Sequence, residues 1–211
     1  MKRNTLLPKG AQAARSASSH DRMLLAAKRL FATRGYENTS TVAIARMAGT
    51  SESQMMKHFG SKEGLLEAIF DRAWMEMEPG IRQAMDSPSP TGKLGTLGGL
   101  MMRKLEKDWD LRSLMLLEGR RIRKEGQMVL LTRGFLNFVR TIDATLREMR
   151  DSREFRSDVN VQAFRSALMG AMEGLMRDQI LARQIGFPAR FGAKDVRRMF
   201  ADLVAAFARK R

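Results

Sequence analysis

The chain has 211 residues, 44% of them hydrophobic, and its 38 lysine and arginine residues against 23 acidic residues leave a net charge of +15. This length suits one medium-sized domain or two small ones, and the hydrophobic share excludes a wholly disordered chain. The lack of cysteine excludes a disulfide scaffold and a thiolate zinc site, and two histidines, His20 and His58, are too few for a multi-histidine metal centre. No apolar run reaches the roughly 20 residues that cross a bilayer, and the first twenty residues contain no secretory segment, so we expect a cytoplasmic protein without a membrane partner.

The positive charge is unevenly distributed along the chain. Residues 1–20 carry +4, residues 21–78 are neutral, and residues 79–211 carry +11. A large excess of this sign indicates an anionic partner such as nucleic acid, but this distribution does not locate its binding site.

Helix-forming residues dominate from Asp21 onward, and no alternating run of strand length occurs, so we expect an all-α fold. Residues 1–17 are expected to form a flexible basic arm. Caps and glycines predict helices at 21–33, between Ser40 and Gly49, at 51–59, and at 61–78, where Pro79-Gly80 ends or kinks the fourth. After a loop-like stretch at 86–99, helices are expected at about 97–108, 110–125, 127–151, 159–184 and 194–209. The chain then divides into a small helical unit, 18–78, and a larger helical bundle, 79–211.

Residues 40–59 have the features of a helix-turn-helix. Ser51 and Gln54 form a capping box for the second short helix, and Gly49 allows a close approach at the turn. Met55 and Phe59 point inward at i and i+4, which leaves polar side chains on the outward face for base edges and phosphates. Helix N-termini nearby favour phosphate. The candidate DNA contacts are Ser40, Thr41, Ser51, Ser53, Gln54, Lys57, His58 and Lys62.

Residues 22–66 resemble the DNA-binding domain of the TetR-family transcriptional regulators. The resemblance rests on fixed spacing over 45 residues and is far more specific than a lone turn motif. The matching residues are Ala27, Phe31, Gly35, Tyr36, Thr39, Ser40, Ile44, Ala45, Ala48, Gly49, Ser51, His58, Phe59, Ser61, Lys62 and Glu63. The remaining chain resembles the family in length and helical layout, with residues 170–175 fitting a familiar pattern of the penultimate helix.

The resemblance implies a homodimer whose recognition helices enter successive major grooves of a palindromic DNA operator. It also implies a C-terminal bundle that binds a small effector and relieves DNA binding, which favours a repressor. Two positions depart from the family: Met56 stands where a phosphate-binding tyrosine is frequent, and Ser53 where a glycine is frequent. We interpret both as altered base preference, because Lys57, His58 and Lys62 remain.

The C-terminal bundle offers candidate effector and dimer contacts. The effector is expected to be apolar, and acidic if the cluster Arg120, Arg121, Arg123 and Lys124 binds it rather than merely ending a helix. The candidate pocket residues are Trp74, Met101, Leu105, Trp109, Met115 and Phe138. The expected dimer interface, in the helices near 159–184 and 194–209, is Phe164, Leu168, Ala171, Leu175, Met199, Leu203 and Phe207. The helix at 61–78 joins both units and is the expected hinge.

Other classes remain as alternatives. Carboxylates alternate with arginines along helices, no glycine-rich phosphate loop follows a strand, and no catalytic pairing of serine and histidine is apparent, so we expect no enzyme and no cofactor. Seventeen methionines suit adaptable core packing better than a soft-metal site. A TetR-like fold that acts through protein partners, or a general basic DNA-binding protein, would fit the same charge.

Overall fold

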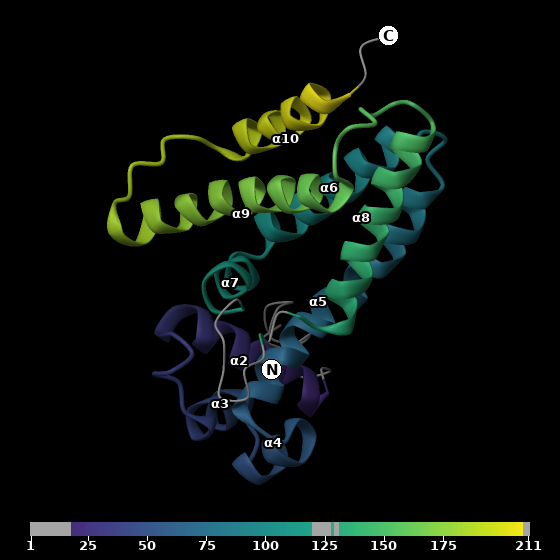
Figure 1. Cartoon of the computed structure of the whole chain (residues 1–211). Helices are drawn as coiled ribbons and strands as arrows, with labels where there is room; N and C mark the ends of the chain where they lie inside the picture. Colours follow the sequence, from purple (N-terminus) through teal and green to yellow (C-terminus); the bar gives the residue numbers. More distant parts are fainter. Residues whose placement is uncertain (1–17, 120–127, 129–130, 209–211) are drawn as a thin grey trace, which may run out of the picture. The chain divides into compact units, whose positions relative to one another are not determined.

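The computed structural model describes residues 18–119, 128 and 131–208, and these residues are almost entirely helical (Figure 1). The predicted all-α fold is confirmed: in these ranges the one extended pairing is an isolated bridge between Phe155 and Ala208. The helices are α2 (Ser19–Arg34), α3 (Thr41–Ala48), α4 (Glu52–Phe59), α5 (Lys62–Met85), α6 (Pro90–Lys107), α7 (Trp109–Ser113), the π-helix η1 (Leu114–Glu118), α8 (Arg133–Asp151), α9 (Val161–Ile185) and α10 (Ala193–Phe207). None of the helices described is both long and apolar enough to cross a membrane. The predicted arm, residues 1–17, and the cluster Arg120–Lys124 lie outside the described residues.

Internal packing divides the chain into two compact units, one up to Ile69 and one from Phe70, so that the division falls within α5. In the N-terminal unit, three serine caps set the helix starts. The side-chain oxygens of Ser18, Ser40 and Ser51 each accept a hydrogen bond from the backbone amide three residues later. These bonds satisfy donors that a helix start otherwise leaves unpaired. The apolar faces of these helices then meet in a small core that contains Met23, Ala27, Phe31, Ile44, Met55, Leu65 and Leu66.

The turn between α3 and α4 differs in two details from the sequence prediction. A Cβ at Gly49 would have no atom within 4 Å, so close approach does not require glycine there. Instead Gly49 has φ +63°, a left-handed conformation that ends α3 and that other residues adopt at a cost. Only half of the predicted capping box forms: Ser51 caps the Gln54 amide, but the Gln54 side chain accepts from the Thr50 hydroxyl.

Pro79 does not end the fourth helix, although an end there is one of the two outcomes that the sequence predicts for it. Helix α5 continues through it to Met85. An internal proline costs about 3 kcal/mol relative to alanine, and we attribute its tolerance to the burial of Met77 and Ala84 on either side. Because Pro90 occupies the first turn of α6 behind the Ser89 cap, the expected loop at 86–99 shrinks to a short connection.

Two other helix predictions need correction. The helix expected at 110–125 is a single α-helical turn, α7, followed by η1, and the remainder lies beyond the described residues. The helix expected from 127 begins at Arg133, where Thr132 caps it. The last two helices match their predicted ranges to within two residues.

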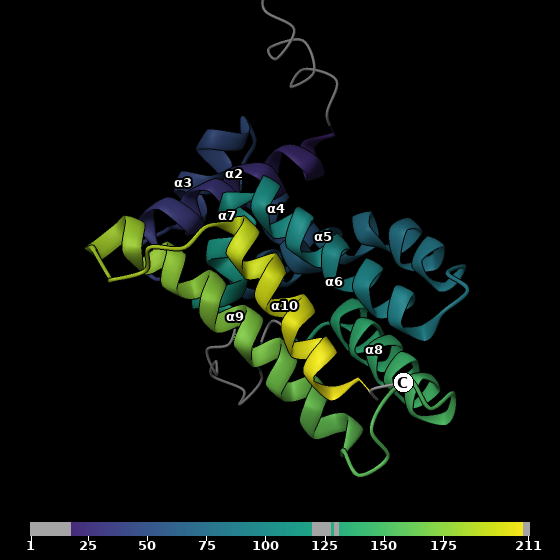
Figure 2. The same ribbon diagram turned by 90° about the horizontal axis from the view of Figure 1, so that it is seen from above.

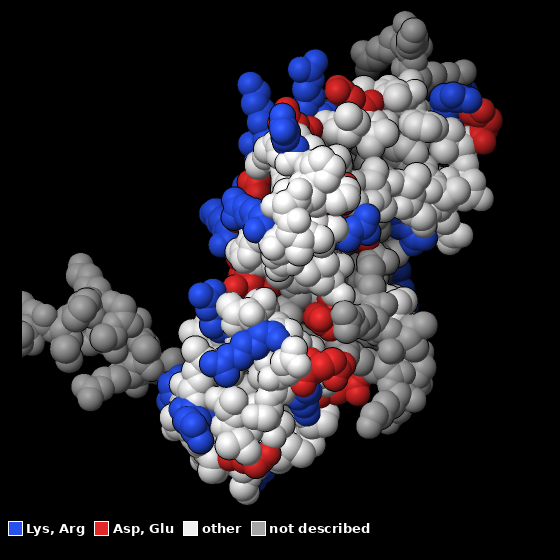
Figure 3. Space-filling model, turned by 90° about the vertical axis from the view of Figure 1, so that its left-hand side faces the viewer, with Lys and Arg blue, Asp and Glu red and all other residues white. Residues whose placement is uncertain are grey.

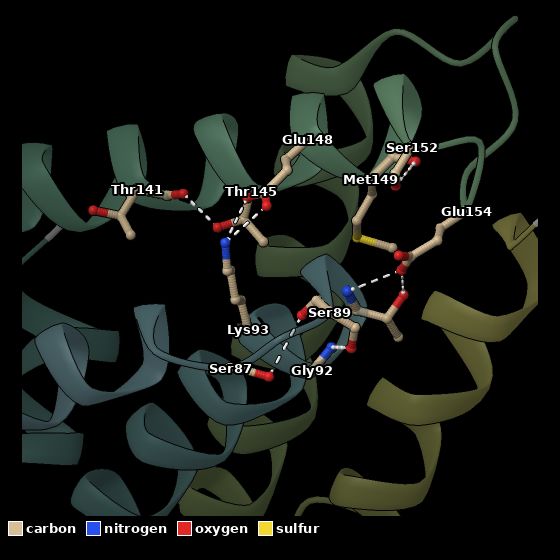
Figure 4. A network of polar contacts seen from close by, with 11 residues as sticks. Ser87, Ser89, Gly92, Lys93, Thr141, Thr145, Glu148, Met149, Ser152 and Glu154 are labelled. Carbon is tan, nitrogen blue, oxygen red and sulfur yellow. Dashed lines mark hydrogen bonds and ion pairs between the residues drawn. The ribbon is translucent and has the colours of Figure 1, made fainter.

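The C-terminal unit packs its helices in layers. Helix α6 packs against α8, and the antiparallel pair α9 and α10 covers them, with α10 also touching α6 (Figures 1 and 2). Gly98 of α6 allows that approach, because a Cβ there would lie 2.4 Å from the ring of Phe200 on α10. At the N-terminal end of α6, Lys93 binds Glu148 of α8 at 2.7 Å, and the Glu154 carboxylate accepts from the Thr91 amide (Figure 4). These contacts join the start of α6 to α8 and to the segment that follows α8.

Candidate DNA-binding interface and effector cavity

Helix α4 presents its polar side to solvent. Met55 is fully buried and Phe59 half-buried, whereas the predicted DNA contacts Ser53, Gln54 and Lys57 are exposed. Burial of one apolar side therefore fixes the rotation of the helix, and the outward side chains follow from the 100° step between residues. The structure brings together the exposed polar side chains that the sequence pattern indicated, on a helix held by α2 and α3.

Hydrogen bonds between neighbouring segments join α2 to α3 and α3 to α4. The Thr41 hydroxyl at the start of α3 donates to the Glu52 carboxylate at the start of α4. Arg22 Nε of α2 donates to the Ala48 carbonyl at the end of α3, at 3.0 Å. Two predicted DNA contacts, Thr41 and Gln54, thus have partners within the unit, so a phosphate or base contact would share or replace these bonds.

Lys62 also has a role within the unit. Its Nζ donates to the carbonyls of Tyr36 at 2.8 Å and Thr39 at 3.1 Å, and it lies 4.2 Å from the centre of the Tyr36 ring. A lysine at a helix N-terminus is unfavourable for the helix dipole, and these carbonyls explain its placement without DNA. Because an ammonium group has three donors, one N–H stays available, and phosphate binding by Lys62 remains a prediction.

The two histidines of the chain meet beside the recognition helix. The rings of His20, on α2, and His58, on α4, lie 5.7 Å apart, and His20 is 4.8 Å from the ring of Phe59. His58 is exposed, as a phosphate contact requires. No periodic pattern in the sequence indicates this pair, because 38 residues separate its members.

The surface of the N-terminal unit is mixed rather than uniformly basic. Its described residues, 18–69, contain seven basic and five acidic side chains. On the face in Figure 3, basic and acidic side chains of the chain are interspersed. Exposed methionines lie among them: Met47 of α3 has 56% of its surface exposed and Met56 of α4 has 41%. Contact with DNA at this helix would therefore combine polar groups with an apolar side chain at Met56.

The C-terminal unit contains an apolar cavity of about 90 Å³. Four predicted pocket residues line it: Met101, Leu105, Met115 and Phe138. The other lining residues are Leu94, Leu97, Gly98, Met102, Leu116, Phe135, Ile142, Leu168, Met169, Met172, Glu173, Met176 and Phe200. Glu173 is the charged member of this set. An interior of this kind accepts an apolar ligand.

The two tryptophans that the sequence placed in the pocket lie outside its lining. Trp74 packs behind the wall, with ring centres 5.2 Å from Phe138 and 5.7 Å from Phe135. Trp109 is flanked by guanidinium groups, Arg112 at 5.3 Å and Arg183 at 4.4 Å from its ring. Aromatic character alone thus does not distinguish a residue that lines the cavity from one that packs behind the lining.

Helix α9 contributes the cavity residues that the sequence missed. Leu168, which we expected at a dimer interface, lines the cavity, and Met172 and Met176 follow on the same face. Phe164 is buried and, with Phe155 and Phe207, forms an aromatic cluster within the chain. Such internal packing leaves Phe164 and Leu168 little surface for a second chain. Of the remaining predicted interface residues, Met199 is exposed, and Ala171, Leu175 and Leu203 are partly exposed.

Charged groups in the C-terminal unit act mainly in its packing. Burial raises the pKa of Glu76 on α5, but hydrogen bonds from Lys104 of α6 and from Arg72 outweigh it, so that the pKa lies below its usual value. Burial, and next the nearby Arg183, lower the pKa of Arg112, and Glu106 opposes this. No group of three histidine or acidic side chains within the described ranges is arranged to hold a metal ion.

Comparison with known proteins agrees with this arrangement. Residues 23–69 match the family described as bacterial regulatory proteins, tetR family. No curated protein matches the sequence.

Solved structures share the fold of almost the whole chain. The regulator FadR from Bacillus subtilis, in complex with stearoyl-CoA, is 19% identical over 88% of this chain and 97% of its own, with a TM-score of 0.76. The fatty acid degradation regulator FadR from Bacillus halodurans is 19% identical over 93% and 99%, with a TM-score of 0.79. A putative regulator from Saccharomonospora viridis, in complex with choline, is 22% identical over 95% and 100%, with a TM-score of 0.67.

The family that residues 23–69 match consists of regulatory proteins, the class that the sequence pattern indicated. Residues 23–69 thus match the tetR family of bacterial regulatory proteins, and the chain shares its fold with solved structures of TetR-family regulators.

Proposed function

We propose that the protein is a ligand-responsive repressor that binds a palindromic operator as a homodimer and leaves it when a small apolar effector occupies the C-terminal cavity. The observation that carries the DNA-binding part is helix α4, whose buried Met55 and Ser51 cap hold Ser53, Gln54 and Lys57 outward. Ser40, Thr41, Ser51, His58 and Lys62 complete the proposed contact surface. A protein that acts on chromosomal DNA works in the cytoplasm, where we place it.

The effector part rests on the cavity. Its lining is aliphatic, thioether and aromatic except for Glu173, and methionine side chains adapt to ligands of different shape. Proteins of similar fold were solved with stearoyl-CoA and with choline, which supports a ligand-binding role for this unit and leaves the ligand of this chain open. Effector would shift the population between two spacings of paired recognition helices, only one of which suits the operator.

The homodimer rests on α9 and α10. Exposed small residues on α9, among them Ala163, Ala167 and Gly170, and the exposed Met199 on α10 leave a surface on which a second copy can pack closely. We propose Ala171, Leu175, Met199 and Leu203 as the interface side chains from our predicted set. The proposal requires two chains per operator.

Selection of bound fragments from random DNA tests the DNA-binding function. We expect a palindromic consensus with two chains bound per fragment, measured by native mass spectrometry. Lys57→Ala should weaken binding to that fragment at least tenfold, whereas Lys107→Ala, an exposed lysine of the C-terminal unit, should leave it unchanged. Fragments without a consensus, bound with a steep salt dependence, would indicate general DNA binding instead. Unchanged affinity after Lys57→Ala and Lys62→Ala would favour action through protein partners.

A further inference from the structure

Arg112, on α7, is a buried cation with neutral partners. Only 6% of its surface is exposed. Its Nη2 donates to the Met176 carbonyl at 2.7 Å and to the side-chain oxygen of Gln179, both on α9. Glu106, the acidic group that influences it, is bound to Arg197 at 2.7 Å. A guanidinium group removed from water normally has a carboxylate or phosphate partner, and the partners that the described residues give Arg112 carry no charge.

Two hydrogen-bond donors beside this charge have no acceptor. Arg112 Nε and the hydroxyl of Ser113, the next residue, are both buried and have no partner among the residues that the structure describes. A buried donor without an acceptor is unfavourable, and such groups usually mark a site that something else fills. The missing group must accept hydrogen bonds, and beside a guanidinium the favoured acceptor is an anion.

The same place adjoins the cavity, although Arg112 and Ser113 are not lining residues themselves. Met176, whose carbonyl accepts from Arg112, is a lining residue, as are Met115 and Leu116, three and four residues after Arg112. Those two residues lie on the π-helix η1, a distortion that is frequent at functional sites. A ligand whose apolar part fills the cavity would therefore have a polar end close to Arg112.

A second cation strengthens the positive potential there. Arg183 of α9 and Arg112 lie at the same Trp109 ring, 4.4 Å and 5.3 Å from its centre. Burial and Arg183 together lower the pKa of Arg112, which is the effect expected of a cation that lacks a counter-charge. An incoming anion would supply that counter-charge.

We propose that the cavity binds an amphipathic anion: its apolar chain contacts the methionine and phenylalanine walls, and its anionic oxygen accepts hydrogen bonds from Arg112 Nε and the Ser113 hydroxyl. This inference rests on the effector site of the proposed function and adds the charge of the ligand. The carboxylate of Glu173, which lines the cavity, would instead favour a ligand with an ammonium group. We favour the anion because Arg112 is more buried than Glu173 and has unused donors.

Three ten-carbon compounds that differ only in the head group test the proposal: decanoate, decanol and decylamine. Each is titrated into the full-length protein without DNA, by calorimetry and by tryptophan fluorescence, which Trp109 should report. We expect decanoate to bind at least tenfold more tightly than decanol, and decylamine more weakly than either. Arg112→Gln and Ser113→Ala should each weaken the binding of decanoate. Arg112→Gln should also make decanoate bind no more tightly than decanol.

Arg140→Gln, at an exposed position on α8, is the matched control and should change none of these affinities. Retained decanol binding would establish that the Arg112→Gln cavity is folded. Three results would overturn the proposal. They are tighter binding of decylamine than of decanoate, an equal loss of affinity for decanoate and decanol in Arg112→Gln, and no binding of any of the three compounds. The DNA selection is independent of these outcomes. If decanoate binds through Arg112 but does not release the selected operator, the proposed effector response is refuted and the proposed anion site is not.

Discussion

The ammonium group of Lys62 lies over the ring of Tyr36 and donates a hydrogen bond to the Tyr36 backbone carbonyl at 2.8 Å. One side chain thus ties the start of α5 to the loop between α2 and α3. Any phosphate that Lys62 binds would meet a group already held in position, so stability and DNA affinity are linked at this residue.

Replacement of Lys62 by alanine should therefore lower both stability and DNA affinity. Hydrogen bonds from a charged donor contribute about 1.5–3 kcal/mol, and partial exposure reduces this, so we expect a loss of about 1–2 kcal/mol in the free energy of unfolding. Urea unfolding measures it. Lys57→Ala, on the exposed side of α4, is the control and should lower DNA affinity without changing the unfolding midpoint. An unchanged midpoint for Lys62→Ala would contradict the packing role.

Met56→Tyr should strengthen DNA binding. The family resemblance of residues 22–66 implies a phosphate-binding tyrosine at the position of Met56, and the exposed side chain there leaves room for a phenol. One added neutral hydrogen bond is worth about 0.5–1.5 kcal/mol, or roughly two- to tenfold in affinity, which a fluorescence titration of the selected operator measures. Met47→Tyr, at the exposed methionine of α3, is the matched control. Equal gains from both substitutions would point to a general effect of tyrosine on that surface.

Gly98 and Gly95 of α6 form a matched pair for the packing of the C-terminal unit. A Cβ at Gly98 would collide with the Phe200 ring at 2.4 Å, whereas one at Gly95 would have no atom within 4 Å. We expect Gly98→Ala to destabilise the protein by about 1–3 kcal/mol through overpacking. Gly95→Ala should stabilise it by up to about 1 kcal/mol, because alanine favours helix. Thermal unfolding distinguishes the two, and a stabilising Gly98→Ala would rule out the close contact of α6 with α10.

The ion pair of Glu76 should make stability depend on acid pH. Its pKa in the folded protein is lowered by Lys104 and Arg72 against the effect of burial. The stabilisation is therefore present above the ordinary carboxyl pKa near 4.5 and is lost as the pH falls through the lower folded value. The pair is half exposed, so the contribution is at most about 1 kcal/mol.

Unfolding free energies of Glu76→Gln and the native protein measure this effect. We expect the variant to be less stable at pH 7 and the difference to shrink as the pH falls toward 3. Glu78→Gln, which removes an exposed pair with Arg82, is the control and should have a smaller effect at pH 7. A difference for Glu76→Gln that stays constant between pH 7 and pH 3 would exclude the ion pair as its cause.

Local patterns in the sequence were sufficient to predict the helical class and the rotation of α4. The Ser40 and Ser51 caps and the inward spacing of Met55 and Phe59 all act within a few residues, where helix geometry leaves few alternatives. The spacing over residues 22–66 was long enough to indicate the family, and residues 23–69 match it.

Tertiary packing determined which side chains share a site. Leu168 lines the cavity, whereas Trp74 packs behind its lining. Both are apolar residues at helical spacing, and that spacing does not predict which neighbouring helix each one contacts. Pro79 remains within α5 and Lys62 reaches back 26 residues to Tyr36, because contacts with distant segments outweigh the local preferences against them. Arg112 looks in sequence like any helical arginine, and only the folding of α7 against α9 buries its charge.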